Sequence, residues 1–249
     1  MYSAWVIFIL ILISSFPVIA AYIWFRAAKY QFSITWFFSA LLAGAAAFFP
    51  ALFFQDLLIG VNITGSRAAL LFEYFIRVAF SEEISRFLVL LVFFRAADMI
   101  VKKKFSDGDE RQNTRPTFNS IKIGAAAGLI AGIGFSILET ARYTASGAEI
   151  NIILLRFFTA AIHGACGSRI GTAAVMLRSN PFQAVLRILT AAAIHGIFNL
   201  MVTIPGFPSI AAFVIAVSAL TTAVLSIRGV NFSAAPNSKA AIDKNEKKS

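Results

Sequence analysis

The sequence predicts an all-α protein, a polytopic bundle of about seven transmembrane helices. Of its 249 residues, 59% are hydrophobic and 14% are charged, whereas soluble domains contain roughly 45–50% apolar and about 25% charged residues. The mean hydropathy is +0.79, and apolar runs recur along the whole chain. Because one soluble core cannot bury this much apolar surface, we expect a lipid bilayer to surround most of the protein. The single Cys166 excludes a disulfide-rich secreted fold.

The apolar runs that define the spans have about the 20 residues that a helix needs to cross a hydrocarbon core. We expect membrane-spanning helices at 4–25, 33–55, 68–97, 118–142, 150–177, 183–203 and 207–228. These helices form one integral membrane domain over residues 1–228, with the motif-bearing core at 68–203. The polar segment 229–249 cannot bury enough apolar surface to fold alone, so we expect a disordered basic tail.

Basic residues alternate between the predicted connections and so indicate the orientation. The base-rich connections are 26–32, 98–117 and the tail after residue 228, and the base-poor ones are 56–67, 143–149 and 204–208. Since cytoplasmic connections carry the excess of Lys and Arg, we predict the N-terminus outside and the C-terminus inside. The same connections account for most of the formal charge of +10. We therefore expect membrane lipids, and no nucleic acid, to face these basic residues.

Glycines recur at every fourth residue on two consecutive predicted helices. They are Gly124, Gly128 and Gly132 on the first, and Gly167 and Gly171 on the second. Small residues on one helix face allow two helix backbones to approach closely in a membrane. We therefore expect helices 118–142 and 150–177 to pack tightly against each other.

Titratable side chains recur inside the predicted spans, where a charge costs roughly 2.5–3.5 kcal/mol on insertion scales. They are Glu82, Glu83, Arg86, Glu139, Arg156, His163 and His195, and Asn199 follows His195 by four residues. Both histidines of the chain are among them. Spacings of three, four and seven residues place such groups on common helix faces. The alternating direction of the helices predicts that Glu139, His195 and Asn199 lie toward the outer side of the bilayer and His163 near mid-depth. Intramembrane ionisable groups usually serve a function.

Two polar groups at the outer ends of the spans have simpler interpretations. Glu73 and Arg77 stand four residues apart and are expected to form a helix salt pair on an amphipathic stretch at the outer surface. Arg142 and Tyr143 are expected to be interfacial anchors.

The intramembrane residue types support hydrolysis. A carboxylate can act as general base toward water, while imidazole and amide groups can stabilise the oxyanion formed when a peptide carbonyl is attacked. The candidate catalytic residues are Glu82, Glu83, Glu139, His163, His195 and Asn199, with Arg86 and Arg156 in support. No metal site is predicted outright, because the chain has no His-Glu-x-x-His helix. A zinc ion held by His163, His195 and Glu82 is the alternative.

Four ordered motifs resemble those of the PrsW family of intramembrane proteases, a branch of the superfamily that includes CAAX prenyl proteases and bacteriocin-immunity proteins. The Glu-Glu-x-x-Lys/Arg motif of the family corresponds to Glu82, Glu83 and Arg86, and its Gly-Phe-x-x-x-Glu-Asn motif corresponds to Gly134, Phe135 and Glu139. The family also has an Arg followed by a His on the next helix, which corresponds to Arg156 and His163. Its last motif, His-x-x-x-Asn/Asp, corresponds to His195 and Asn199. The chain departs from the family at Thr140, where Asn is usual, and at Gly167, where Ser or Thr often follows the His by four.

This resemblance implies a multi-pass endopeptidase that cleaves a membrane-anchored protein, such as an anti-sigma factor, near the outer side of the bacterial cytoplasmic membrane. In the implied reaction Glu82 or Glu83, with His163, activates water, while His195 and Asn199 stabilise the oxyanion. Two other classes stay open on the residues themselves. One is a non-enzymatic peptide-binding or immunity-type protein that uses the same polar cavity, and the other is a proton-coupled transporter.

Overall fold

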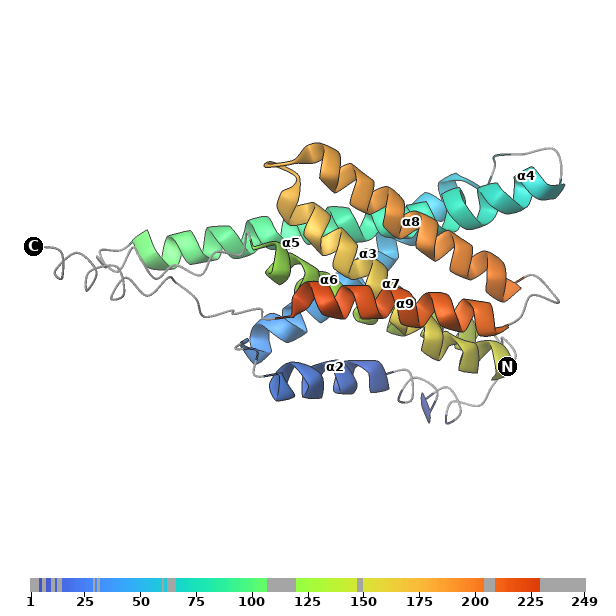
Figure 1. Ribbon diagram of the computed structural model, residues 1–249, viewed down its shortest axis with the longest axis horizontal. Coiled ribbons are helices and arrows are strands. Elements are labelled where there is room, and N and C mark those ends of the chain that lie inside the picture. The colour runs from blue at the N-terminus through green and yellow to red at the C-terminus, as the bar shows by residue number, and fades with distance from the viewer. Residues whose placement is uncertain are drawn as a thin grey trace, which may run out of the picture.

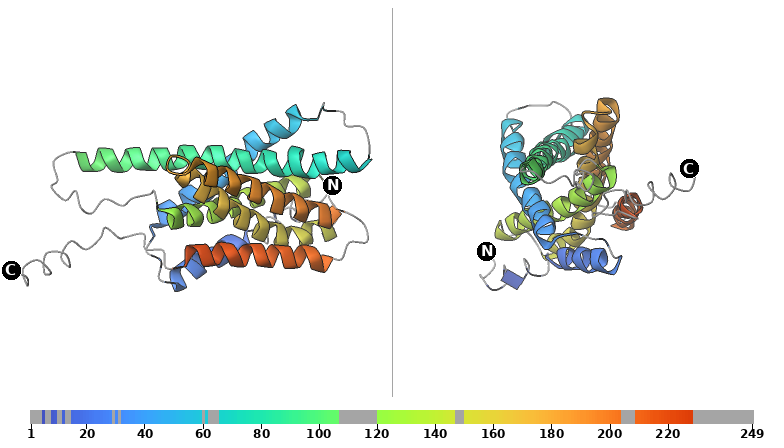
Figure 2. Two further views of the ribbon diagram at one scale, coloured as in Figure 1. Left: turned by 45° about the horizontal axis from the view of Figure 1, so that its top comes forward. Right: turned by 90° about the vertical axis from the view of Figure 1, so that its left-hand side faces the viewer.

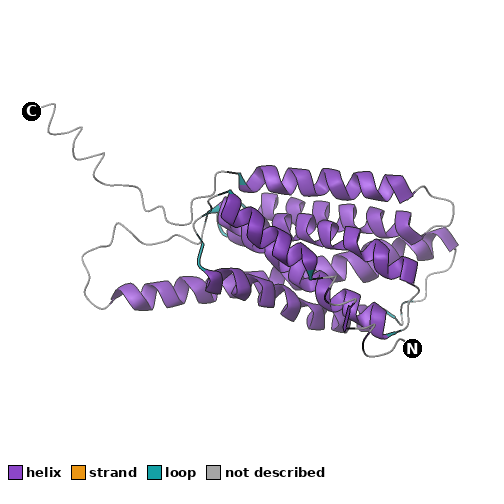
Figure 3. Ribbon diagram, turned by 90° about the horizontal axis from the view of Figure 1, so that it is seen from below, coloured by secondary structure: helices purple, strands orange, loops and turns teal. Residues whose placement is uncertain are grey.

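The computed structural model describes residues 15–28, 32–59, 66–106, 120–146, 150–203 and 209–228, together with the single residues 5, 8, 9, 12, 30 and 61. Within the helices, the side chains at 66, 101–106, 150–157, 203 and 209 lie outside this description. Every regular secondary-structure element in the described ranges is a helix, and Figure 3 shows no strand among them. The all-α fold class is therefore confirmed.

The helices follow the predicted apolar runs. They are α2 (Phe16–Ala27), α3 (Ile34–Leu57), α4 (Ser66–Leu71), the π-helix η1 (Phe72–Phe80), α5 (Ser81–Ser106), α6 (Ile121–Ala145), α7 (Ile150–Met176), α8 (Pro181–Thr203) and α9 (Ser209–Ile227). Among the described residues, α3, α6, α8 and α9 are long and apolar enough to cross a membrane, as expected of a multi-pass membrane protein. The count of seven spans and their orientation stay predictions, and much of the first predicted span lies outside the described residues.

The third predicted span differs from the structure in length and regularity. Helices α4, η1 and α5 run without a break from Ser66 to Ser106, whereas the sequence predicted a helix over 68–97 followed by a loop. In Figure 1, α5 extends beyond its neighbours toward its C-terminal end. The added turns contain Met and Lys, which are good helix formers in water, so the helix does not have to end where the apolar run ends.

Helix α6 occupies the interior of the bundle, with α3 and α7 packed against it (Figures 1 and 2). Its residues from Ile123 to Ser136 are buried on all sides, which a helix tolerates because small and apolar side chains surround it completely. A central helix of this kind fixes the positions of the helices that touch it.

The predicted glycine contact between α6 and α7 is confirmed. A Cβ atom added to Gly128 would lie 1.9 Å from the carbonyl oxygen of Gly167, and one added to Gly132 would lie 1.9 Å from that of His163. The two backbones are therefore in direct contact, and any larger side chain would push them apart. This contact sets the height and rotation of α7, and hence of His163, relative to α6.

Candidate functional site

The first part of the site is the start of α5, directly after the π-helical segment. There Ser81 Oγ donates to the carbonyl of Ile76 at 3.3 Å and Ser85 Oγ donates to that of Ser81 at 2.6 Å. These hydroxyls supply donors to backbone carbonyls where the helix changes its winding. Glu82 and Glu83, in the first turn of α5, are 2% and 0% exposed. Two adjacent carboxylates are therefore held inside the bundle.

Glu82 faces histidines from two other helices. The Nδ1 atom of His163, on α7, lies 3.9 Å from Glu82 Oε2, and the Nε2 atom of His195, on α8, lies 3.7 Å from the same oxygen. The two imidazole rings meet edge to face with centroids 4.8 Å apart. Three helices thus bring one carboxylate and two imidazoles to a single buried point.

The three atoms that face one another are unsatisfied. Glu82 Oε2, His163 Nδ1 and His195 Nε2 are buried and have no hydrogen-bond partner among the described residues, and they lie within 4.8 Å of one another. A buried polar atom without a partner costs about 1–3 kcal/mol, and such atoms normally bind water or an ion. Their convergence indicates a place for a bound group.

The remaining nitrogen of each histidine is bonded to a second carboxylate. His163 Nε2 lies 2.7 Å from Glu139 Oε2, and His195 Nδ1 lies 2.9 Å from Glu83 Oε1. An ionised carboxylate accepts but does not donate, so each of these ring nitrogens carries the proton. The opposite nitrogen of each neutral ring then presents its lone pair toward Glu82.

Arg86 connects the carboxylates to the backbone of α7. Its guanidinium donates to Glu83 Oε1 through Nη2 and to the carbonyl of His163 through Nη1 at 3.1 Å, and its Nη2 lies 3.9 Å from Glu82 Oε2. Arg86 is 0% exposed and its Cζ lies 4.8 Å from the ring centroid of Phe135. The planar fork of arginine suits this set of acceptors, and its charge compensates part of the buried negative charge.

Gln55 belongs to the cluster although the sequence motifs do not include it. From α3, its Nε2 donates to Glu82 Oε1 at 3.1 Å, which leaves Oε2 to face the two histidines. No sequence signal marks this residue beyond an amide near the end of an apolar run, because its partner is 27 positions away in the chain.

The other predicted site residues have separate places. Asn199 is half-buried on α8, one turn after His195, and the side chain of Arg156 lies outside the described part of the chain. Cys166 is buried and its thiol donates to the carbonyl of Ala191 at 3.4 Å, as expected of a small packing residue.

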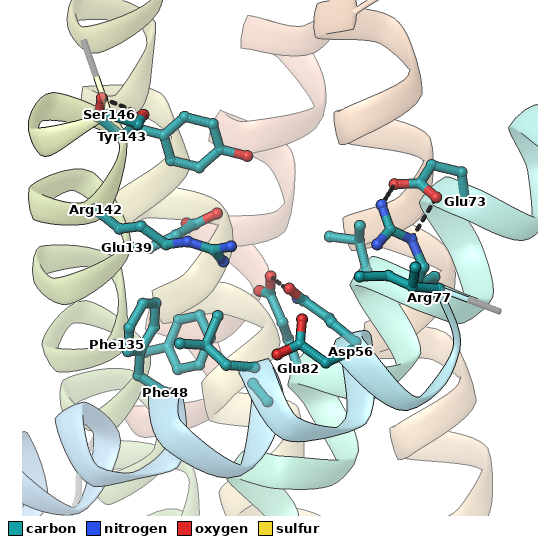
Figure 4. A pocket seen from close by; sticks show the side chains of 15 residues that line it. Phe48, Asp56, Glu73, Arg77, Glu82, Phe135, Glu139, Arg142, Tyr143 and Ser146 are labelled. Carbon is teal, nitrogen blue, oxygen red and sulfur yellow. Dashed lines mark hydrogen bonds and ion pairs between the residues drawn. The ribbon is translucent and has the colours of Figure 1, made fainter. Parts of the chain in front are cut away.

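A cavity of about 300 Å³ leads to the cluster from one end of the bundle. Figure 4 shows Glu82 and Glu139 at its inner end, with the paired Glu73 and Arg77 on one wall and Arg142 on the other. The predicted salt pair between Glu73 and Arg77 is confirmed. A substrate can therefore approach the Glu82 carboxylate through the cavity.

The cluster suits a divalent metal ion, zinc above all. Two imidazole nitrogens and one carboxylate oxygen form one of the ligand sets of catalytic zinc sites, with bonds of about 2.0–2.2 Å. Neighbouring ligand atoms of a tetrahedral site with these bonds lie roughly 3.4 Å apart. The separations of 3.7 and 3.9 Å from Glu82 Oε2 are close to that value, and all three atoms lie within 4.8 Å of one another. The carboxylates behind both histidines also match the usual surroundings of metal-bound imidazole. This ligand set is the one that the sequence offered as its alternative.

Comparison with known proteins assigns the chain to a family. Residues 33–225 match the model of the PrsW family intramembrane metalloprotease, a range that contains the whole Glu82, His163 and His195 cluster. The curated proteins and the solved structures give no match. The match covers more than half of the chain, and it agrees with the four motifs found in the sequence and with the buried carboxylate and imidazole groups. The chain therefore belongs to the PrsW family of intramembrane metalloproteases.

Proposed function

We propose that the protein is an endopeptidase that hydrolyses a peptide bond of a membrane-anchored protein, with Glu82, His163 and His195 as its reaction centre. The observation that carries the proposal is the convergence of three unsatisfied ligand atoms, Glu82 Oε2, His163 Nδ1 and His195 Nε2. One of the three residues, Glu82, also lines a cavity. A peptidase needs buried catalytic groups together with a path by which the substrate can reach them.

In the proposed centre the three atoms hold a divalent metal ion. Such an ion, when bound, supplies Lewis acidity that polarises the scissile carbonyl and makes water a better nucleophile at neutral pH. Glu139 and Glu83 hold the histidine rings in the required tautomers through their hydrogen bonds. Gln55 fixes the rotation of the Glu82 carboxylate, and Arg86 holds Glu83 in place.

A metal-free form of the same reaction uses the cluster differently. Glu82 then takes the proton of the attacking water with the help of His163, and His195 with Asn199 stabilises the oxyanion. The paired carboxylates behind both histidines favour the metal-bound form, because they leave the Nδ1 atom of one ring and the Nε2 atom of the other as lone-pair donors directed at one point.

The family supports a membrane protein as the substrate. A protease within the bilayer acts on a membrane protein, and we propose a single-span protein of the anti-sigma-factor type, cut near the outer surface of the bacterial cytoplasmic membrane. The proposed topology has seven spans within residues 1–228, with the N-terminus outside and the tail 229–249 in the cytoplasm. The basic connections support this orientation.

The test is hydrolysis of membrane-anchored single-span reporters by the purified full chain in detergent, together with its zinc content. We expect close to one zinc per chain, loss of cleavage after treatment with a chelator, and recovery on adding zinc. Glu82→Gln and His195→Ala are expected to lose both zinc and cleavage. The matched control is Asp98→Asn, about 24 Å further along α5, which should keep both. Cleavage that survives complete zinc removal would support the metal-free form, and equal cleavage by the parent and both variants would overturn the proposal.

A further inference from the structure

The cavity carries one cation whose role the reaction centre does not explain. Arg142 lies on α6, three residues after Glu139, and lines the cavity; in Figure 4 its guanidinium points into the open space. It makes no ion pair or side-chain hydrogen bond within the part of the chain that the structure describes. Arg142 is exposed and borders the approach to Glu82, so the interfacial position that the sequence predicts does not remove it from the path of a substrate.

Most of the acidic groups that line the cavity are bonded to other partners, and none of the lining acids forms an ion pair with Arg142 among the described residues. Glu73 is paired with Arg77 on the opposite wall. Glu139 is bonded to His163, and Glu82 to Gln55. The remaining acid of the lining, Asp56, is exposed on α3 and lies near enough to Arg77 to act on it electrostatically. Within the described ranges, Arg142 is thus a bidentate donor without an acidic partner, and it faces the space where a substrate would enter.

The spacing between Arg142 and Glu139 sets how far from the reaction centre a bound substrate group would lie. Arg142 stands about 4.5 Å along α6 from Glu139, a rise that an extended chain covers in one to two residues at about 3.3 Å each.

We propose that Arg142 is a specificity-determining residue that binds a carboxylate of the substrate, the side chain of an Asp or Glu within about three residues of the scissile bond. The inference rests on the proposed function, since it assigns the cavity to the substrate of that reaction. An arginine fork binds a carboxylate through two parallel hydrogen bonds, which fixes the register of the substrate segment over the reaction centre. Substrates of this protein therefore carry an acidic residue beside the cleaved bond.

The test measures binding independently of hydrolysis. Single-span probe proteins that carry one Asp, Asn or Lys at each of six positions in the outer juxtamembrane segment are titrated against the full chain carrying Glu82→Gln, which keeps the probes intact. We expect the best Asp probe to bind about tenfold tighter than its Asn counterpart, as for a charge-assisted hydrogen-bonded pair. Arg142→Gln should reduce this ratio to below about twofold, Arg142→Lys should keep part of it, and Arg142→Glu should make the Lys probe the tightest. Arg95→Gln, about 20 Å along α5 from Glu82, is the matched control and should keep the tenfold ratio.

Cleavage of the same probes by the chain with Glu82 intact separates this inference from the proposed function. Equal binding of Asp and Asn probes, or an Asp preference that persists in Arg142→Glu, would overturn the role of Arg142 even if cleavage is observed. An Asp preference that Arg142→Glu reverses would support that role. If no cleavage accompanied this preference, the result would count against the proposed peptidase activity but not against the role of Arg142.

Discussion

The Nε2 atom of His163 lies 2.7 Å from Oε2 of Glu139, and this bond turns the other ring nitrogen toward Glu82. Glu139 thereby influences the proposed reaction centre through the His163 ring. The same arrangement recurs at His195 and Glu83 at 2.9 Å, although the bonded nitrogen there is Nδ1. The two histidines therefore reach one point through different ring atoms, and each depends on its own carboxylate.

Replacing Glu139 by Gln is expected to weaken metal binding. The amide lacks the negative charge that makes His163 a stronger ligand, and losing such a partner typically lowers metal affinity roughly 10–100-fold. Competition with a chromophoric zinc chelator measures the change, with Asp98→Asn as the control. An unchanged zinc affinity in Glu139→Gln would contradict the role given to this hydrogen bond.

Replacing Arg86 by Leu is expected to destabilise the fold strongly. Arg86 and Glu83 are both fully buried, and removing one partner of a buried pair costs about 3–5 kcal/mol because the other charge is left uncompensated. Thermal unfolding in detergent measures the loss. Arg86→Lys keeps the charge but lacks the fork, so we expect it to lie between the parent and Arg86→Leu. Equal stability of all three proteins would exclude a structural contribution of the pair.

Adding one methyl group at Gly128 is expected to separate α6 from α7. Its Cβ would lie 1.9 Å from the backbone oxygen of Gly167, whereas a Cβ at Gly164 would lie 3.5 Å from its nearest neighbour. Gly128→Ala should therefore destabilise the protein by about 1–3 kcal/mol or more, as overpacking does, while Gly164→Ala should have the stability of the parent. Thermal unfolding of the two variants side by side measures this difference. A Gly128→Ala protein as stable as the parent would show that the two helices can shift apart.

Replacing Gly196 by Ala is expected to disturb η1 rather than the metal ligands. The new Cβ would lie 2.6 Å from Cδ1 of Phe75, so η1 would have to move away from α8 or the ring would have to rotate. We expect about a tenfold lower cleavage rate in Gly196→Ala and partial recovery in the double variant with Phe75→Leu, which removes the ring. Reporter cleavage and zinc content measured together check this. Cleavage in the double variant no better than in Gly196→Ala would rule out the contact as the cause.

The sequence predicted much of the fold because apolar length and glycine spacing act within single helices. The predicted run 118–142 corresponds to α6, and the glycines placed on one face of it are those that meet α7. Two features could not be read in this way. The π-helix over Phe72–Phe80 cannot be predicted from a pattern based on regular α-helical spacing. Helix α5 continues to Ser106, beyond the apolar run, where Met and Lys favour a helix.

The candidate site divides in a similar way between sequence and structure. The cost of placing ionisable groups in a bilayer is enough to predict, from the order of residues alone, the larger set of candidate groups to which Glu82, His163 and His195 belong. Their relation to Gln55 and to Arg142 depends on contacts between different helices, which spacing along one helix cannot specify. The role of Asn199 and of Arg156 stays a prediction.

The sequence by itself determined the membrane class, the run of helices and the identity of the few polar groups inside them, because each follows from local chain composition and the cost of leaving water. The tertiary structure decided which atom of each group is bonded and which stays open. Glu83 pairs with Arg86 and His195, while Glu82 keeps Oε2 free beside both histidines. That division depends on the rotation of α5, α7 and α8 about their axes, which the close contacts of glycine backbones at α6 and α7 and of Gly196 with Phe75 fix.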